Sequence, residues 1–327
     1  MSKVSGYIVL GILSVCYGSA YAFVSKALKY YEGSVLNSMR MWFAFSGALT
    51  VFLMNYALVG SFRSSLSRYK TPALSCMFCG TLNYGLPHSL ISLAQATIPS
   101  TIVIIAQPFV SMFVLLFSSL LLPDEKLTVT KFLIQCVAIT GAIITSVPNF
   151  ANIDFASGGF NFFHYILLIC ALLSFAFGSI YIKKYLTNCN PILMAVYQLL
   201  GSSIYATFFS IYRNTFVGYI GNIMAPEIKA LFYPVLLGLG FTCSATFMSA
   251  YTIRKLGVTI AGFANYGQII VGIIVGVFFM GEWNSYSGKD IAIALFGVTV
   301  LAVSMISGLV VKEKVRTDDE ENLLSSA

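Results

Sequence analysis

Charged residues are scarce in this sequence. Asp, Glu, Lys and Arg make up 9% of its 327 residues, whereas 58% of the residues are hydrophobic. Soluble domains carry about 25% charged residues, and a soluble protein of this length could not cover its surface with so few charges. The scarcity therefore excludes a soluble globular protein and predicts a membrane protein with several spans.

Acidic residues are also missing from the middle of every long hydrophobic run. All twelve Asp and Glu residues lie at the ends of the runs, between them or in the C-terminal tail. Many proton-coupled pumps use a carboxylate inside the membrane. Its absence argues against such a pump and favours a facilitator or exchanger, or a transport step linked to His88.

Motifs of membrane-embedded enzymes are absent. The chain has no H-E-x-x-H and no G-x-S-x-G, and its two histidines, His88 and His164, lie far apart. The seven cysteines are scattered, and the C-x-x-C of Cys76 and Cys79 lies inside a hydrophobic run, so we interpret them as packing residues. The net charge of +7 comes from basic residues that stand singly between hydrophobic runs, not from a nucleic-acid-binding stripe. We expect no enzymatic activity, cofactor, metal or nucleic-acid partner.

Hydrophobic runs of about 20 residues dominate the chain, and this length suits a helix that crosses a bilayer. The first run begins like a signal peptide, with Lys3 before it and Ala20-Tyr21-Ala22 near its end, but we expect it to be retained as a helix. The runs predict ten transmembrane helices, at about residues 5–27, 34–57, 72–94, 99–121, 129–147, 162–184, 192–212, 230–252, 257–280 and 289–311.

A similar order of residues occurs in each half of the chain. A Pro or Gln, a hydrophobic run, a Glu just outside it and a second run containing a Gly follow one another in both halves. Duplicated helical units are typical of small-solute transporters. The residues are Pro108, Glu125 and Gly141 in the first half, and Gln268, Glu282 and Gly297 in the second.

The polar stretch 148–161 divides the predicted helices into five and five. Because five is odd, the second half would enter the membrane in the opposite sense, which makes the repeat an inverted one. We therefore predict an all-α membrane protein of ten transmembrane helices in two inverted five-helix repeats, residues 1–147 and 162–311. A disordered cytosolic tail, residues 312–327, would follow.

Basic residues are divided unevenly between the two sides that this topology defines. Thirteen of the 19 Lys and Arg residues fall on the side of the termini and six on the other side. The positive-inside rule then places both termini in the cytosol. The tail segment Asp319-Glu320-Glu321-Asn322-Leu323-Leu324 fits an acidic dileucine signal. We expect the plasma membrane or, if that signal is used, an endosomal or vacuolar membrane.

Polar side chains fall on one face of several predicted helices, three or four residues apart. Amides and an imidazole are costly in hydrocarbon, so these residues either line a solute cavity or form hydrogen bonds between helices. His88 is the sharpest candidate, because it is the only ionisable side chain near the middle of a predicted span. The cavity candidates are Tyr17, Tyr21, Tyr84, His88, Gln95, Gln107, Tyr181, Asn265 and Gln268.

Six further residues are expected to have structural roles. Two prolines would kink or hinge their helices, and two glutamates would cap or pin the helices that follow them. Two glycines form a G-x-x-x-G, which favours close packing within the chain over dimerisation. These residues are Pro87, Pro108, Glu125, Glu282, Gly272 and Gly276.

Three basic residues lie on the predicted non-cytosolic side, within or near the first two helices: Lys26, Lys29 and Arg40. They would either attract an anionic solute or extend to lipid headgroups. The sequence leaves both alternatives open.

Four sets of residues match the pattern of a known family: Tyr17-Gly18-Ser19 with Lys26; Arg40; Ala94-Gln95-Ala96-Thr97 with Pro108 and Glu125; and Met280-Gly281-Glu282 with Gly297. Through these residues the chain resembles the drug/metabolite transporter superfamily, in its ten-helix EamA-like form, over nearly its whole length. It departs from the usual pattern at Tyr17, where tryptophan is usual, at Gln268, where proline is common, and at Pro123-Asp124-Glu125, which replaces Gly-Glu. The resemblance implies a central cavity between helices one, three, four, six, eight and nine, and adds Ser19 to the cavity candidates.

These observations predict a transporter that moves a small polar metabolite by alternating access, as an exchanger or a facilitator. The alternative is a membrane scaffold or receptor-like protein without transport, for which the short loops and tail offer little surface. The expected partners are a small-molecule solute and the lipid bilayer, and the expected state is a monomer or a homodimer.

Overall fold

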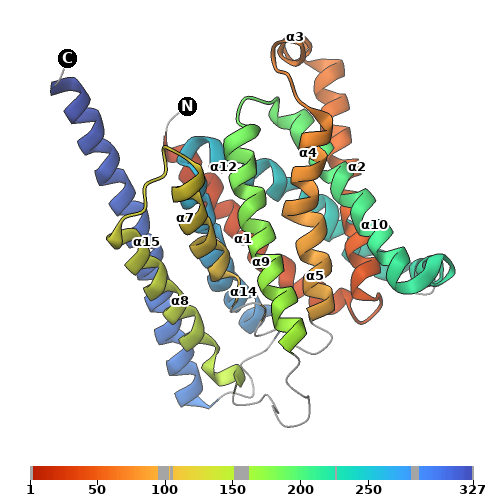
Figure 1. Ribbon diagram of the computed structural model, residues 1–327. Helices are drawn as coiled ribbons and strands as arrows, with labels where there is room; N and C mark the ends of the chain where they lie inside the picture. The colour runs from red at the N-terminus through yellow and green to blue at the C-terminus, as the bar shows by residue number, and fades with distance from the viewer. Residues whose placement is uncertain are drawn as a thin grey trace.

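The computed structural model describes residues 3–94, 103, 106–150, 162–224, 227–280 and 287–325. The described residues form helices and their connections, with no strand among them (Figure 1). The predicted all-α class is therefore confirmed.

The helices of the first half end at Phe150 and those of the second half begin at Phe162. In the first half they are α1 (Lys3–Ala27), α2 (Gly33–Leu58), α3 (Gly60–Arg68), α4 (Ala73–Gly80), η1 (Thr81–Gly85), α5 (Leu86–Ala94), α7 (Pro108–Leu121) and α8 (Val129–Phe150). In the second half they are α9 (Phe162–Tyr185), α10 (Pro191–Met224), η2 (Ile228–Leu231), α11 (Phe232–Val235), η3 (Leu236–Cys243), α12 (Ser244–Leu256), α13 (Val258–Gly262), α14 (Ala264–Met280) and α15 (Gly288–Ser325).

Eight helical stretches within the described residues are long and apolar enough to cross a membrane. The third and fourth predicted spans are not among these eight. The third forms one unbroken run of α4, η1 and α5, but it carries Asn83, Tyr84 and His88. The described helix of the fourth is α7, which has 14 residues. The third span is thus too polar, and the described helix of the fourth too short, to be counted among the eight.

Side chains that cap the backbone fix the start of the second helix in each half. The Glu32 carboxylate accepts hydrogen bonds from Ser34 N (2.9 Å) and Val35 N (3.2 Å) at the start of α2. At the start of α10, Asn190 Oδ1 accepts from the amides of Ile192 and Leu193, both at 3.1 Å. These caps satisfy N–H groups that the first turn of a helix leaves without partners.

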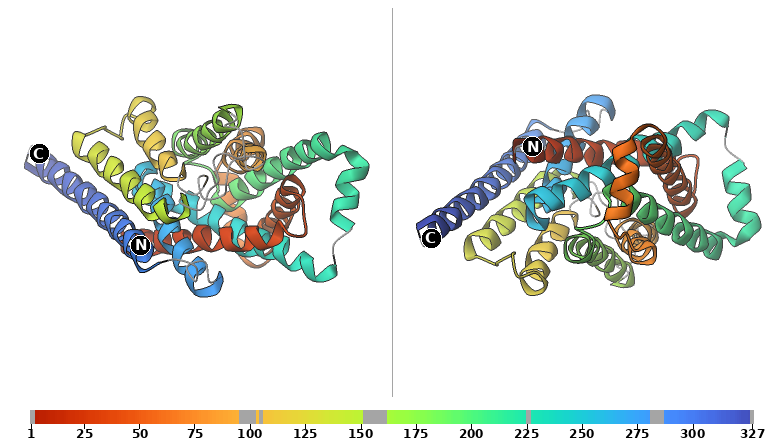
Figure 2. Two further views of the ribbon diagram at one scale, coloured as in Figure 1. Left: turned by 90° about the horizontal axis from the view of Figure 1, so that it is seen from below. Right: turned by 90° about the horizontal axis from the view of Figure 1, so that it is seen from above.

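Helices from the two halves pack against each other in matching pairs. α8 lies along α15 at one end of the elongated bundle, and α2 lies along α10 at the other end (Figures 1 and 2). Between them, α1 packs on α14 as α7 packs on α9, and α4 packs on α10 as η3 packs on α2. Along the direction of the helices, the start of α1 and the end of α15 lie at the same end of the bundle, at the top of Figure 1.

Glycines allow the closest of these crossings. A Cβ added to Gly297 would lie 2.4 Å from the backbone nitrogen of Thr145, and one added to Gly141 would lie 2.9 Å from that of Leu301. The two glycines that the sequence repeats therefore face each other where α8 crosses α15. Any larger residue would push the two helices apart.

Irregular backbone occurs at corresponding places in the two halves. The α-helical ladder widens to a π-helix in η1 and again in η3. After η1, the amide of Leu86 donates to Thr81 O, five residues back. Pro87 explains part of this, because it has no N–H to donate to the carbonyl of Asn83. A second irregularity is a one-residue interruption of the hydrogen-bond ladder at Gln107, before α7, and at Phe263, between α13 and α14. Gln107 O and Phe263 O each accept from the amide three residues on, at 3.0 Å, and both residues keep helical backbone angles.

Three features differ from the expectations. The short helix α3 follows α2 where a loop was expected. The helix α10 is interrupted at Thr215, whose φ of 60° and ψ of 165° are non-helical. The helix α15 continues to Ser325, although we expected disorder from residue 312. No Gly or Pro follows Gly308 to end it, and Lys314–Asp318 and Arg316–Glu320 have the i,i+4 spacing that favours a helix.

Candidate functional site

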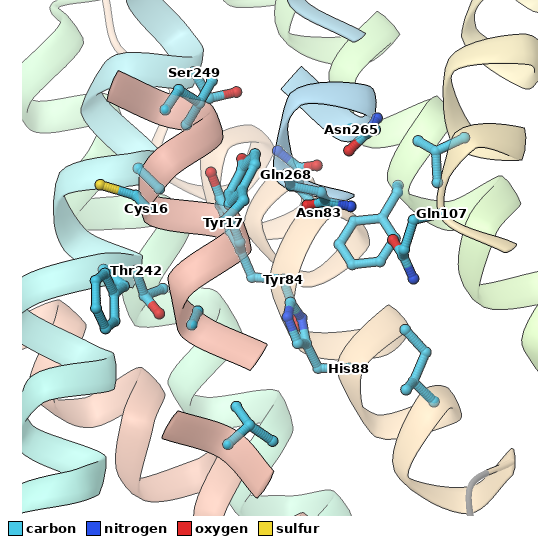
Figure 3. A pocket seen from close by; sticks show the side chains of 18 of the residues that line it. Cys16, Tyr17, Asn83, Tyr84, His88, Gln107, Thr242, Ser249, Asn265 and Gln268 are labelled. Carbon is cyan, nitrogen blue, oxygen red and sulfur yellow. The ribbon is translucent and has the colours of Figure 1, made fainter. Parts of the chain in front are cut away.

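A cavity of about 170 Å³ lies in the middle of the bundle, between the two halves. Its wall is contributed by α1, α2, η1, α5, α7, α9, η3, α12, α13 and α14 (Figure 3). The π-helices η1 and η3 and the interrupted segments at Gln107 and Phe263 are all part of this region. Irregular backbone at membrane depth is tolerated where it lines such a cavity.

Six of the predicted cavity residues meet at this wall. Tyr17 comes from α1, Tyr84 from η1 and His88 from α5, and Figure 3 shows them close together. Gln107 stands immediately before α7, while Asn265 and Gln268 come from the first two turns of α14. Residues more than 250 positions apart in the sequence therefore surround one space.

Of the other four predicted residues, two lie outside the cavity wall and two are not described. Tyr181 is half-buried outside the cavity, where its hydroxyl is 2.8 Å from that of Ser75 and its ring packs against Phe78 and Tyr185. Ser19 is half-buried in α1 and is not a lining residue. Gln95 and the side chain of Tyr21 lie outside the described part of the chain.

Several lining residues were not among the predicted cavity residues. Asn37 and Arg40 line the cavity from α2, a helix that the implied cavity did not include. Their i,i+3 spacing places them on one face, so helical periodicity could have indicated the pair. Asn83 also lines the wall, next to Tyr84, because the wider turn of η1 alters the facing of its residues. Other polar lining residues are Cys16, Ser92, Ser179, Thr242 and Ser249.

The hydrogen bond of His88 Nδ1 identifies the tautomer of its neutral ring. His88 Nδ1 lies 2.8 Å from Tyr84 O. A carbonyl oxygen can only accept, so Nδ1 carries the proton and Nε2 of the neutral ring is an acceptor. The ring also meets Phe175 edge-on, with centroids 5.3 Å apart at 82°. The imidazole is therefore held in one orientation.

Arg40 connects α2 to the π-helix η3. Its Nε donates to Thr242 Oγ1 at 2.6 Å, and the Thr242 hydroxyl donates in turn to Leu237 O at 2.8 Å. This contact fixes the plane of a guanidinium that is half-buried in the cavity wall. Among the described lining residues, Arg40 is the one permanent charge, and there is no Asp or Glu.

The interrupted segments are bonded to each other across the two halves. Ser111 Oγ donates to Gly262 O at 2.6 Å, and Asn265 Nδ2 donates to Ser111 Oγ at 3.3 Å. The hydroxyl of Tyr266, which is fully buried, contacts Gln135 Oε1. These bonds satisfy polar groups that the interruptions would otherwise leave exposed to hydrocarbon.

Some polar atoms of the wall have no partner within the described residues. Both amide atoms of Asn37 and the Nε2 of Gln268 are buried without a hydrogen bond. The two side chains are 6% and 5% exposed. Leaving such a group unsatisfied costs about 1–3 kcal/mol, so buried orphans are uncommon and call for an explanation.

The cavity reaches the end of the bundle where α1 joins α2, and polar contacts tie helices together at both ends. Leu28 and Gly33, at the connection of α1 and α2, are lining residues. At this end Asn214 Nδ2 of α10 donates to Glu32 Oε2 at 3.2 Å. At the end where α1 begins, Ser5 Oγ lies 2.9 Å from the Tyr251 hydroxyl. Other links at that end are Lys183 Nζ to Asp124 Oδ2 at 2.9 Å, and Arg254 Nη2 to the carbonyls of Leu186 (2.9 Å) and Cys189 (3.0 Å).

Four of the six predicted structural residues are described with their surroundings, and none of these four lines the cavity. Glu125 is buried, at 4% exposure, and accepts a hydrogen bond of 2.9 Å from Thr259 Oγ1 in α13. It thus links the first half to the second, in addition to preceding α8. Gly272 packs against Gly18: a Cβ on Gly18 would lie 2.9 Å from Gly272 N.

Pro108 occupies the first turn of α7, where its missing N–H costs no hydrogen bond. Pro87 is buried in α5, directly after the π-helix. Glu282 and the surroundings of Gly276 lie outside the described part of the chain.

Comparisons with known proteins agree with this architecture. Residues 4–147 match the model of the EamA-like transporter family, which confirms the resemblance expected from the sequence. No curated protein matches the chain significantly. Among 27 matching solved chains, one titled only as the crystal structure of a protein has a TM-score of 0.69 at 14% identity. It covers 96% of this chain and 99% of its own length, so the shared fold extends over both halves.

Proposed function

We propose, from the match of residues 4–147 to the EamA-like transporter family, that this membrane protein carries a small polar solute across a membrane through its central cavity. The observation that carries the proposal is the cavity itself. It lies between the two halves, and its polar groups come from helices with irregular backbone. Substrate sites of secondary transporters lie near the middle of the bilayer, at the interface of the two repeats.

The packing supports two inverted five-helix repeats. In such a repeat the counterparts are α1 and α9, α2 and α10, α4 and η3, α7 and α14, and α8 and α15. Exchanging each helix with its counterpart turns the α1–α14 contact into the α9–α7 contact. It also turns α4–α10 into η3–α2, and returns α8–α15 and α2–α10 to themselves. The matching π-helices and interruptions follow the same exchange. On this basis we assign ten spans, counting α4–η1–α5 and the segment that ends in α7.

We further propose alternating access as the mechanism, in the manner of a facilitator or exchanger. The charge bias assigns the end where α1 begins to the cytosol. Polar contacts such as Ser5–Tyr251 tie that end together, while the cavity reaches Leu28 and Gly33 at the other. This arrangement fits a carrier closed toward the cytosol. Transport would break these contacts and close the cavity at the opposite end.

Of the two expected states, a monomer or a homodimer, the use of Gly272 within the chain favours the monomer. Because Gly272 already packs against Gly18, its G-x-x-x-G is occupied on that face by α1. A dimer would need another surface.

Transport by purified protein in liposomes tests the proposed function. A metabolite panel should contain solutes that wild-type protein equilibrates, and His88→Ala, Gln107→Ala and Asn265→Ala should each reduce that flux. Ser119→Ala serves as the matched control, because this half-buried serine lies in α7 but does not line the cavity. Undiminished transport in all three cavity variants would contradict the proposed site.

A further inference from the structure

The charge of the cavity wall restricts the solute. Arg40 is the one permanent charge among the described lining residues, and none of them is acidic. Arginine remains protonated in proteins. This positive charge at the cavity wall attracts an anion. A bound cation would instead add a second like charge to a region of low dielectric constant.

The geometry beside Arg40 fits a carboxylate. Asn37 lies one helical turn before Arg40 on the same face of α2, and both residues line the cavity. The bond to Thr242 sets the plane of the guanidinium, and both amide atoms of Asn37 are buried without a partner. The guanidinium N–H groups and the amide N–H are both donors that a carboxylate accepts.

The opposite side of the cavity offers contacts for the rest of the solute. Gln268 Nε2, on α14, is a buried donor with no partner within the described residues. His88 Nε2 is an acceptor in the neutral ring, since Nδ1 is used by Tyr84 O. The rings of Tyr17, Phe175 and Phe241 also line the space. These groups suit an unsaturated or aromatic body that carries a polar substituent.

Size sets an upper limit on the solute. The cavity volume is about 170 Å³, and a cavity of roughly 150 Å³ is enough to hold benzene. A solute with one ring or a short chain therefore fits, and a nucleotide does not fit this conformation. Charge sets a second limit. The single positive charge of Arg40 balances a monoanion, whereas a dianion would keep one negative charge unbalanced.

We infer that the solute is a small organic monoanion whose carboxylate binds at Arg40 and Asn37. The inference rests on the proposed transport function and specifies its substrate class. It assigns α2 as the helix that selects charge, and α14 with α5 as the helices that select the body of the solute.

Three probes of nearly the same shape and different charge test this inference: benzoate, benzamide and benzamidine. Each is added to the purified full-length protein in detergent, and the thermal unfolding temperature is measured. Benzoate should raise that temperature, with an affinity at least tenfold above those of neutral benzamide and cationic benzamidine. A stronger shift with benzamidine or benzamide would overturn the assignment of an anion.

Substitutions at the proposed charge site separate it from general binding. Arg40→Gln should remove the preference for benzoate over benzamide, and Arg40→Lys should keep a weaker preference, because it keeps the charge but not the planar fork. Asn37→Asp should also abolish benzoate binding, since it places a like charge beside the carboxylate. An unchanged preference in Arg40→Gln would overturn the role of this residue. If a variant does not fold, the three-probe comparison on wild-type protein still decides the charge class.

The outcomes also distinguish this inference from the proposed transport function. Preferential binding of benzamidine would reject the anion and leave a solute cavity in place. Absence of binding by all three probes would reject the monoanion, whereas transport itself is judged by the metabolite panel in liposomes.

Discussion

Individual residues show how buried polar groups are divided between structure and binding. Serines and threonines of the spans mostly donate to carbonyls of their own helix, as Ser89 does to Gly85 O and Thr246 to Thr242 O. Asn37 and Gln268 differ, because they keep polar atoms without a partner at the cavity wall. The sequence alone could not separate these two groups, since both place polar side chains in apolar runs.

His88 provides the sharpest test at a single residue. His88→Asn places an amide nitrogen near the position of Nδ1, so it should keep the bond to Tyr84 O but lose the group at Nε2. His88→Gln extends further and should retain part of the contact with the solute. We expect roughly a tenfold loss of transport in the Asn variant, as for loss of about 1.4 kcal/mol of binding, and a smaller loss in the Gln variant. Flux into liposomes measures the loss of transport, and the unfolding temperature checks that the bond to Tyr84 O is kept. Equal flux in the Asn variant and the wild-type protein would contradict this role of His88.

Thr259 tests the link that Glu125 makes between the halves. Thr259→Val keeps the shape of the side chain but removes the hydroxyl that donates to the buried Glu125 carboxylate. Thermal unfolding of the purified variant should show a free energy of unfolding that is lower by about 1–3 kcal/mol, because the buried carboxylate loses a donor. Thr140→Val is the control, because Thr140 is exposed and its hydroxyl bonds only within its own helix to Cys136 O. Equal stability of the two variants would show that the link contributes nothing.

At the scale of helices, hydrophobic runs predicted the positions of most spans but not their irregularities. The run 72–94 became one continuous helical stretch, yet nothing in its length indicated the π-helix at Thr81–Gly85. Pro87 was a signal of a distorted ladder, but it did not specify how the distortion would be accommodated. Because η1 changes the facing of Asn83, a regular helical wheel missed that residue.

The repeated glycines give a prediction for helix packing. Gly297→Ala would place a Cβ 2.4 Å from Thr145 N, so α8 and α15 would have to separate. Overpacking of this kind costs about 1–3 kcal/mol. Gly11→Ala is the matched control, because a Cβ at that position in α1 has no atom within 4 Å. Unfolding in detergent should show a lower transition temperature for Gly297→Ala and no loss for Gly11→Ala; comparable values would contradict the close crossing.

At the scale of the whole molecule, the division into two halves was visible in the sequence, whereas the cavity between them was not. The order Pro or Gln, Glu, Gly indicated a duplication, and the structure brings Gly141 and Gly297 into contact. Which faces of the helices meet depends on packing across the two halves. The sequence gives no register for that packing, so Arg40 could be assigned neither to the cavity nor to the lipid headgroups until the fold was known.

The proposed topology predicts that both termini are on the cytosolic side. The start of α1 and the end of α15 lie at the same end of the bundle (Figure 1), as an even number of spans requires. Tags at the two ends should therefore show the same accessibility in intact cells and become accessible together when the membrane is permeabilised. Tags found on opposite sides would reject ten spans.

The most direct test of the central claim is to fill the cavity with a large side chain and to measure solute counterflow in liposomes. Ser92→Trp places a large ring at a half-buried lining residue, and Ser119→Trp does so at a half-buried serine outside the cavity. Both serines donate to a carbonyl three residues back, at 2.8 and 2.7 Å, so the two variants lose a similar bond. Counterflow should be abolished in Ser92→Trp and retained in Ser119→Trp. Equal counterflow in both variants would show that the solute does not pass through this cavity.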